Sequence, residues 1–241
     1  MMAALRSRLR DRQRLVGLSF KVLLGRRGWV AVPLPLLWSA WEALRLILGW
    51  RETAFEPVDV QNGLIGMPLV ILAIGLGIRI IAGEMDRRTV EIAWTIPGGS
   101  HRLWLAKLAA AALVLASAEV LLGVVTWAFF TEFDPGALWG AWQGACVYLA
   151  LSAGLAALFR SEVTGAMATS AVLALNLLLT GFGEAQSRLS PLFNAVAVDD
   201  LAPQDLLAWT VQNRIGWALG FVALVALAFA RAERRETLLS G

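Results

Sequence analysis

The chain is poor in the residues that bind metal ions, form disulfides or act as catalytic bases. It has one cysteine, Cys146, and one histidine, His101. A single cysteine excludes an internal disulfide framework and a cysteine-rich metal site, and a single histidine excludes a multi-histidine site. His101 has no partner at a spacing that would make it a catalytic base. These scarcities argue against metal-dependent and acid–base chemistry.

Two sequence signatures of common enzymes are also missing. No GxxxxGK[ST] run occurs, so the chain is not expected to bind ATP through a P-loop. No GxSxG run occurs either, which argues against a serine hydrolase elbow. We therefore predict that the chain is not an enzyme and has no cofactor of its own.

Charge is scarce as well, and apolar residues take its place. Only 16% of the 241 residues are charged and 58% are hydrophobic. A soluble domain has about 25% charged and about 45–50% apolar residues. The composition predicts an all-α membrane protein with several spans.

Six apolar stretches are long enough, or nearly so, to cross a bilayer as helices, which takes roughly 20 residues. They form one predicted transmembrane domain, 29–230, followed by a tail, 231–241. The predicted spans are 29–50, 63–82, 108–130, 137–159, 163–182 and 215–230.

The segment 1–28 is rich in arginine and lacks the apolar core of a secretory signal. Leu5, Leu9, Val16, Phe20 and Leu23 fall near one helical face. This pattern predicts an amphipathic helix on the cytoplasmic membrane surface, the alternative being a solvated arm.

Basic residues fix the expected orientation, because cytoplasmic loops carry an excess of lysine and arginine. With six spans and a cytoplasmic N-terminus, most of the 21 basic residues lie inside, and only Arg51, Arg188 and Arg214 lie outside. Both termini are therefore predicted to be cytoplasmic. The same clustering beside spans favours a membrane surface over nucleic acid.

The loop 83–107 lies between the second and third spans and does not resemble a simple linker. Val90, Ala93 and Trp94 share one side of a predicted short helix, which Pro97 ends. Ser100 can cap the helix that follows. A short helix tied to two spans suits the transfer of motion from a soluble partner.

This loop resembles the cytoplasmic segment of ABC-2-type transporter permeases. The resemblance is carried by Glu84, the run Arg88-Thr89-Val90-Glu91, then Pro97, Ser100 and Lys107. The chain differs from that pattern at Arg88, where the family usually has glycine.

The resemblance implies a permease subunit that serves export across the plasma membrane, or the inner membrane of a bacterium. It implies two copies of a separate ABC ATPase subunit, which hold ATP and Mg²⁺, and a second permease subunit of the same or a sister chain. It assigns ATPase coupling to Glu84, Asp86, Arg87, Arg88, Thr89, Val90, Glu91, Trp94 and Pro97.

Glu119 lies about 18 Å into the third span, near the middle of the membrane. A charge there is expensive, so the residue is either part of a substrate path or paired locally, for example with Arg45 or Asn176. Glu42 and Arg45 interrupt the first span at a spacing that allows a mutual ion pair. Arg79 lies close enough to the cytoplasmic end to reach lipid headgroups.

Gly136, Gly140 and Gly144 form consecutive GxxxG units in the fourth span. Small residues at this spacing let helices approach closely, so the motif predicts a packing seam between spans or subunits, unless it arises by chance in a glycine-rich chain. The segment 183–214 is predicted to form short helices at the outer leaflet, one with Leu189, Leu192, Phe193 and Val196 at helical spacing and one that starts at Pro203 and Asp205.

Two other functional classes remain open. An ion-coupled carrier, or a membrane scaffold, would use Glu119 and Arg45 as its buried charges. An intramembrane enzyme would need clustered catalytic groups within the spans, which the sequence does not show.

Overall fold

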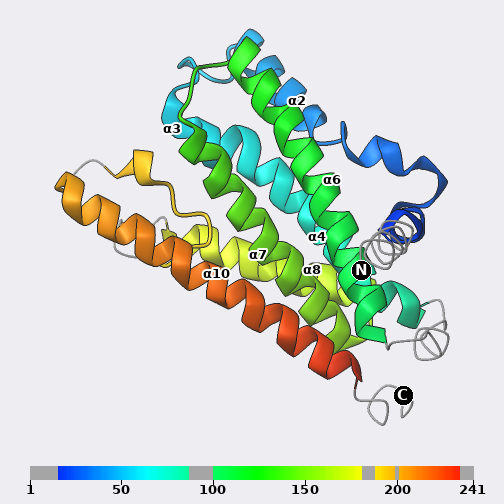
Figure 1. Ribbon diagram of the computed structural model, residues 1–241. Coiled ribbons are helices and arrows are strands. Elements are labelled where there is room, and N and C mark those ends of the chain that lie inside the picture. The colour runs from blue at the N-terminus through cyan, green and yellow to red at the C-terminus, as the bar shows by residue number, and fades with distance from the viewer. Residues whose placement is uncertain (1–15, 87–99, 181–187, 199–200, 234–241) are drawn as a thin grey trace, which may run out of the picture.

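In the computed structural model, residues 16–86, 100–180, 188–198 and 201–233 are described, and every regular element within these ranges is a helix (Figure 1). The elements in chain order are η1 (Gly25–Ala31), α2 (Leu36–Ile47), α3 (Pro57–Asp59), the π-helix η2 (Val60–Gly66), α4 (Met67–Asp86), α6 (Ser100–Phe129), α7 (Pro135–Phe159), α8 (Glu162–Thr180), η3 (Ala195–Ala197) and α10 (Pro203–Glu233).

Helix α7 is the centre of the bundle and packs against α4, α8 and α10. It can serve three neighbours because many of its buried positions are small, including Ala145, Ala153 and Ala156. Small side chains allow the axes of membrane helices to approach closely. Helix α6 packs mainly against α4, and its start also contacts the end of α10.

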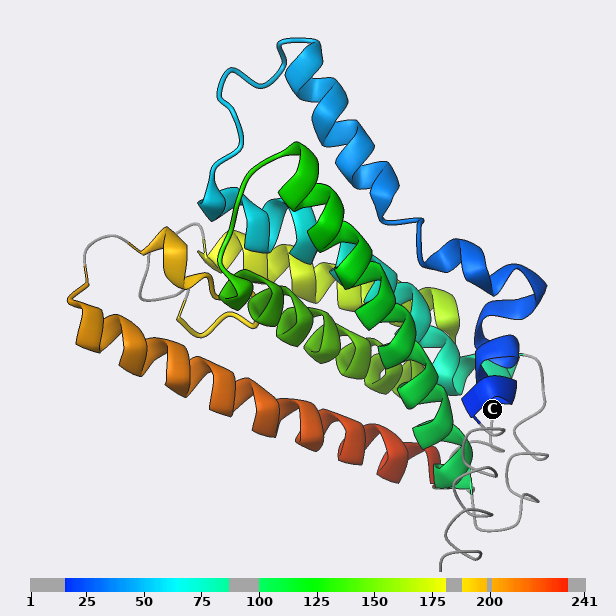
Figure 2. The ribbon, with the colours of Figure 1, turned by 45° about the horizontal axis from the view of Figure 1, so that its top comes forward.

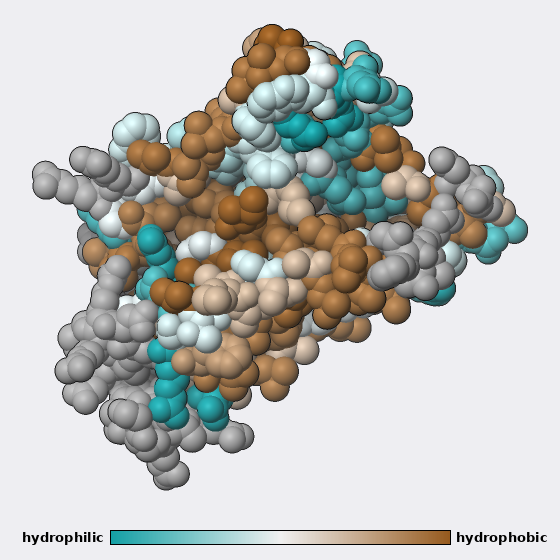
Figure 3. All heavy atoms as spheres, turned by 180° about the vertical axis from the view of Figure 1, so that it is seen from behind, coloured by the Kyte–Doolittle hydropathy of each residue, from teal (hydrophilic) through white to brown (hydrophobic). Residues whose placement is uncertain are grey.

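Five helices are long and apolar enough to cross a membrane: Pro57–Glu84, Ser100–Phe129, Pro135–Phe159, Glu162–Thr180 and Pro203–Glu233. Helices α8 and α10 are buried least, and they expose apolar side chains such as Met167 and Leu219. Figure 3 shows a broad apolar surface across the middle of one face, with hydrophilic residues nearer the ends. These features define a helical membrane protein.

The predicted first span, 29–50, is not a continuous helix. A 3-10 helix ends at Ala31, a turn follows, and α2 then has only 12 residues. That is about 18 Å of helix, well short of a hydrocarbon core of about 30 Å. Pro33 and Pro35 interrupt the stretch because proline removes a backbone donor and crowds the preceding turn. Figure 2 shows α2 standing away from the other helices.

The predicted second span begins earlier than expected. Pro57 takes the first helical position, and Glu56 and Asp59 form a reciprocal capping box around it. The helix continues through the π-turns of η2, where the Met67 N–H reaches the carbonyl of Asn62. The predicted last span also begins earlier, at Pro203, because no helix-breaking residue separates the expected short helix from the span.

The described part of the predicted surface helix, residues 16–24, is helical. Val16, Phe20, Leu23 and Leu24 pack against the main hydrophobic core, so the predicted apolar stripe faces the bundle. Leu18 and Val22 are exposed on the other side. Residues 1–15 and most of the predicted tail lie outside the described residues.

The two ends of the bundle are distinct. Helix 16–24, the end of α4, the start of α6 and the end of α10 lie together: an Arg79 N–H donates to the Leu23 carbonyl at 3.3 Å, and His101 Nδ1 lies 3.8 Å from a Glu233 carboxylate oxygen. We call this the Glu84 end. The opposite end, where α3 and η3 meet, we call the Arg188 end.

Candidate functional site

The junction between α4 and α6 holds the residues that the sequence marked as a motif on both sides of the loop. Helix α4 ends at Asp86 and α6 begins at Ser100. Arg87, Arg88, Thr89, Val90, Glu91, Trp94 and Pro97 lie outside the described residues, as does the side chain of Asp86. The two motif residues that flank the loop, Glu84 and Lys107, are both described.

Glu84 and Lys107 form a buried ion pair. Lys107 Nζ lies 2.6 Å from Glu84 Oε1, and the lysine side chain is 1% exposed. Lys107 Nζ also donates to the Ile80 carbonyl at 3.0 Å. A buried ammonium requires several acceptors to offset its desolvation. The pair therefore fixes the last turn of α4 against the second turn of α6.

Trp104 extends this junction to a third helix. Its indole N–H donates to Glu84 Oε2 at 3.3 Å, and its ring centroid lies 5.6 Å from that of Phe229 on α10. His101, one turn earlier, lies beside Glu233 near the end of α10. The contacts of Glu84, Trp104 and His101 therefore link α4, α6 and α10. We call Glu84, Trp104 and Lys107 the junction cluster.

Arg79 contacts protein groups at the same end. It donates to the Leu23 carbonyl, and its Nε lies 4.0 Å from Glu162 Oε2 on α8. Its side chain is nevertheless 48% exposed, so part of the guanidinium still faces outward. These contacts connect helix 16–24 and α8 to α4, one turn before the junction cluster.

Glu119 lies in the middle of α6, where its carboxylate is next to Trp142 and Cys146 of α7. The residue is 9% exposed, and among the described residues its Oε1 atom has no hydrogen-bond partner. The two expected partners are engaged elsewhere: Arg45 pairs with Glu42, and Asn176 donates to Ser190 Oγ at 3.0 Å. Glu119 is thus a buried carboxyl that hydrogen-bonds to the Trp142 backbone and forms no ion pair with a basic side chain in the described part of the chain.

The ion pair expected from the spacing of Glu42 and Arg45 is present, with Arg45 Nη1 2.9 Å from Glu42 Oε1. The pair lies on α2, whereas Glu119 lies on α6. The two residues therefore neutralise each other, and the structure does not bring Arg45 to the buried carboxyl of α6.

The glycine series of α7 faces other parts of the same chain. Gly136 lies beside its own cap residue Asp134, and a Cβ at Gly140 would meet the Gln61 amide at 2.3 Å. A Cβ at Gly144 would meet a Leu192 methyl at 2.6 Å. The seam predicted from the GxxxG spacing therefore receives η2 and the segment 188–198.

Segment 188–198 closes the Arg188 end through side chains that reach its backbone carbonyls. Gln61 donates to Phe193 O at 2.8 Å, and Asn213 donates to Arg188 O at 2.7 Å and Ser190 O at 2.8 Å. Gln143 and Arg214 hydrogen-bond to each other at 3.1 Å. A buried irregular segment is stable only when other protein groups satisfy its backbone hydrogen bonds in this way.

The sequence analysis overlooked Gln61, Gln143 and Asn213. Gln143 is a single amide side chain within an apolar run, and that isolation is the signal that could have identified it. Gln61 precedes Asn62, and Asn213 lies between Gln212 and Arg214, so neither is isolated in the sequence. Buried polar groups among apolar helices are costly unless they are hydrogen-bonded, so each implies a partner from another element.

The described residues contain no group of three or more histidine, cysteine, aspartate or glutamate side chains that could hold a metal ion. Comparison with known proteins gives no further identification: no protein-family model, curated protein or solved structure matches this chain. The fold and its five apolar helices define the class as a helical membrane protein.

Proposed function

We propose that this chain is the transmembrane permease subunit of an ATP-driven exporter, similar to ABC-2-type permeases, with ATP hydrolysed by a separate subunit. The observation that carries the proposal is the junction cluster. Glu84 and Lys107, which flank the loop in the sequence motif, form a buried ion pair at 2.6 Å. A loop that receives force from a partner needs rigid attachment to the spans on both sides.

The contacts around the cluster give a mechanical route into the bundle. Trp104 packs on Phe229 of α10, and Arg79 of α4 lies near Glu162 of α8. Force on the 87–99 segment would therefore reach α4, α6, α8 and α10 through side-chain contacts. In this proposal two ATPase subunits dock at the Glu84 end, and a second permease subunit completes the substrate path.

The docking step can be tested by affinity purification in mild detergent. Wild type should retain an ATPase subunit, identified by mass spectrometry, and the purified complex should hydrolyse ATP. Trp94→Ala and Glu91→Arg should reduce both the retained subunit and the hydrolysis several-fold. The matched controls Trp139→Ala and Glu132→Arg change exposed residues near the opposite end of the bundle and should retain both.

Equal retention in all five proteins would contradict the assignment of the loop. Purification of a folded, intact chain that retains no ATPase would contradict the permease function itself.

A second candidate function, an ion-coupled carrier, is favoured by Glu119. Its buried Oε1 lacks a partner among the described residues, which is the condition expected of a carboxyl that takes up and releases a proton. Liposomes containing the purified chain alone would then show proton uptake driven by a pH gradient, and Glu119→Gln would abolish it. The permease proposal predicts no such uptake without an ATPase subunit.

A further inference from the structure

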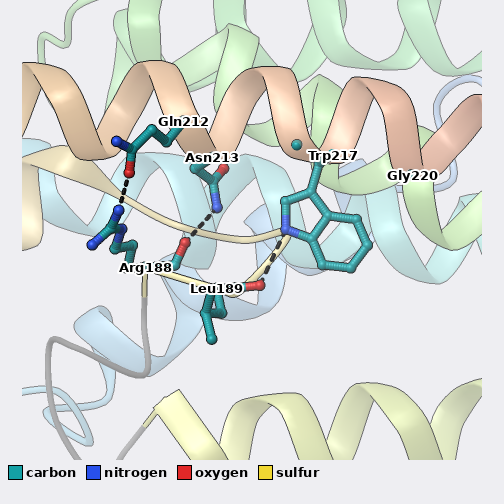
Figure 4. Close-up of a pocket in the computed structure, with 7 residues that line it drawn as sticks. Arg188, Leu189, Gln212, Asn213, Trp217 and Gly220 are labelled. Atoms are coloured by element: carbon teal, nitrogen blue, oxygen red, sulfur yellow. Dashed lines mark hydrogen bonds between the residues drawn. The ribbon is translucent and has the colours of Figure 1, made fainter.

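The Arg188 end contains a hollow between segment 188–198 and α10, with a volume of about 520 Å³. Arg188, Leu189 and Gln212 lie at one end of it, and Gly216, Trp217 and Gly220 lie further along α10 (Figure 4). From Gln212 to Gly220 the hollow follows α10 for about 12 Å, or two helical turns. Its lining therefore changes from polar to apolar along the helix axis.

From these features we infer that the hollow binds one phospholipid, with the headgroup phosphate at the Arg188 guanidinium and one acyl chain along the α10 face between Gly216 and Gly220. This inference requires only that α10 crosses a bilayer, and it does not depend on ATP-driven transport.

Arg188 is placed to bind an anion. Its guanidinium lies over the Trp209 ring, 5.0 Å from the centroid, and among the described residues its side chain donates one hydrogen bond, to Gln212. A guanidinium has five N–H donors, so several remain for phosphate oxygens. None of the seven residues that line the hollow is acidic. The neighbouring Arg214 is already engaged by Gln143 and the Phe193 carbonyl.

The rest of the hollow fits an acyl chain. A Cβ at Gly216 would meet no atom within 4 Å, so the absence of a side chain there leaves open space. The Trp217 ring borders this space, and its indole N–H is fixed by the Leu189 carbonyl at 3.1 Å. Ile215, Leu219 and Val222 on the same helix are exposed, as expected for a surface facing lipid.

The position of the hollow along α10 agrees with a lipid whose headgroup lies at Arg188. Helix α10 spans 31 residues, about 46 Å, which exceeds a hydrocarbon core of about 30 Å. The apolar run begins at Ile215, directly after Gln212, Asn213 and Arg214. Headgroup level therefore coincides with Arg188 and Gln212, and the glycines lie below it.

Native mass spectrometry of the purified full chain in detergent tests the inference, with three probes added in turn. Dioleoyl phosphatidylglycerol has both the phosphate and the chains, dioleoylglycerol lacks the phosphate, and sn-glycerol 3-phosphate lacks the chains. Only phosphatidylglycerol should bind strongly. Arg188→Gln should weaken that binding about tenfold, because a charge-assisted hydrogen bond is lost.

Gly216→Leu, which fills the hollow, should weaken phosphatidylglycerol binding to a similar degree. Gly75→Leu is the matched control, because Gly75 is also an exposed glycine with no atom within 4 Å of an added Cβ. It should bind like wild type. If Arg188→Gln does not fold, Gly216→Leu and the three probes decide the question.

Unchanged phosphatidylglycerol binding in both hollow variants would overturn the inference. Equal binding of dioleoylglycerol would also overturn it, because the site would then be an apolar groove without a headgroup contact. Strong binding of sn-glycerol 3-phosphate alone would overturn it in favour of a soluble anion site.

Discussion

The Glu84 carboxylate and the Lys107 ammonium lie in an environment where each charge depends on the other. Both are buried, and they are 2.6 Å apart. Breaking such a pair by removing one partner is far more costly than replacing both, because the remaining charge is left in the protein interior.

Glu84→Leu should therefore lower the free energy of unfolding by about 3–5 kcal/mol, because it leaves the Lys107 ammonium in the interior. The double variant Glu84→Leu/Lys107→Met should recover much of this loss, because no uncompensated charge remains. Thermal unfolding in detergent would measure both. A double variant less stable than the single one would show that the pair contributes to stability through its geometry and not only through mutual neutralisation.

The Trp104 indole offers a second test of the same junction cluster. Trp104→Phe keeps an aromatic ring near Phe229 and removes the N–H that donates to Glu84. We expect a loss of about 1.5–3 kcal/mol, typical of a hydrogen bond to a charged group, in the same unfolding measurement. No change in stability would mean that the Trp104 contact with Glu84 contributes nothing beyond packing.

The helices are held together by close approach of their backbones to α7. Gly77 of α4 shows this most directly, since an added Cβ would lie 2.5 Å from the Leu149 carbonyl oxygen of α7. A backbone atom inside a helix cannot move aside cheaply. Gly75, two residues earlier on α4, has open space around it.

Gly77→Ala should thus destabilise the fold by roughly 1–3 kcal/mol through overpacking between α4 and α7. Gly75→Ala should be neutral or slightly stabilising, because alanine is the better helix former. The difference between the two unfolding temperatures measures the effect of the close contact between α4 and α7 at Gly77. Equal effects in both variants would mean that α4 shifts freely on α7.

Sequence patterns located α7 and α8 within about two residues at each end and found the apolar parts of α4, α6 and α10, because an apolar run of about 20 residues is a strong signal. The spans that contain the latter three helices begin before their apolar runs. They did not indicate that residues 29–50 would be broken, although Pro33 and Pro35 are visible in the sequence. Hydrophobicity alone made the stretch appear continuous. The ion pair of Glu42 and Arg45 followed from local spacing, whereas the contact between Gln61 and Phe193 joins residues 132 positions apart and has no local signature.

For the molecule as a whole, the charge distribution predicts that the Glu84 end faces the cytoplasm. Helix 16–24, the start of α6 and the end of α10 all lie at that end, and they carry Lys21, Arg102, Lys107 and Arg231. The sequence before residue 16 adds Arg6, Arg8, Arg10, Arg12 and Arg14, and an excess of lysine and arginine is typical of the cytoplasmic side. The Arg188 end would then face outward, which makes the two ends distinguishable in intact cells.

Cysteine labelling with a membrane-impermeant maleimide tests this orientation in a Cys146→Ser background. Glu52→Cys should react in intact cells, and Arg102→Cys should react only after permeabilisation, since both positions are exposed but lie at opposite ends. The reverse pattern would place the Glu84 end outside. It would also remove the docking site from the compartment that contains ATP.

The hydrogen bond between Gln61 and the Phe193 carbonyl also bears on how the protein is made. The amide and its acceptor are 132 residues apart in the chain. At about 5–20 residues per second, the ribosome needs roughly 7–26 s to produce the acceptor after the amide has been synthesised. During that interval the helix containing Gln61 is in or near the membrane without its final partner. Its definitive position is therefore reached only late in biogenesis, when segment 188–198 arrives to close the bundle.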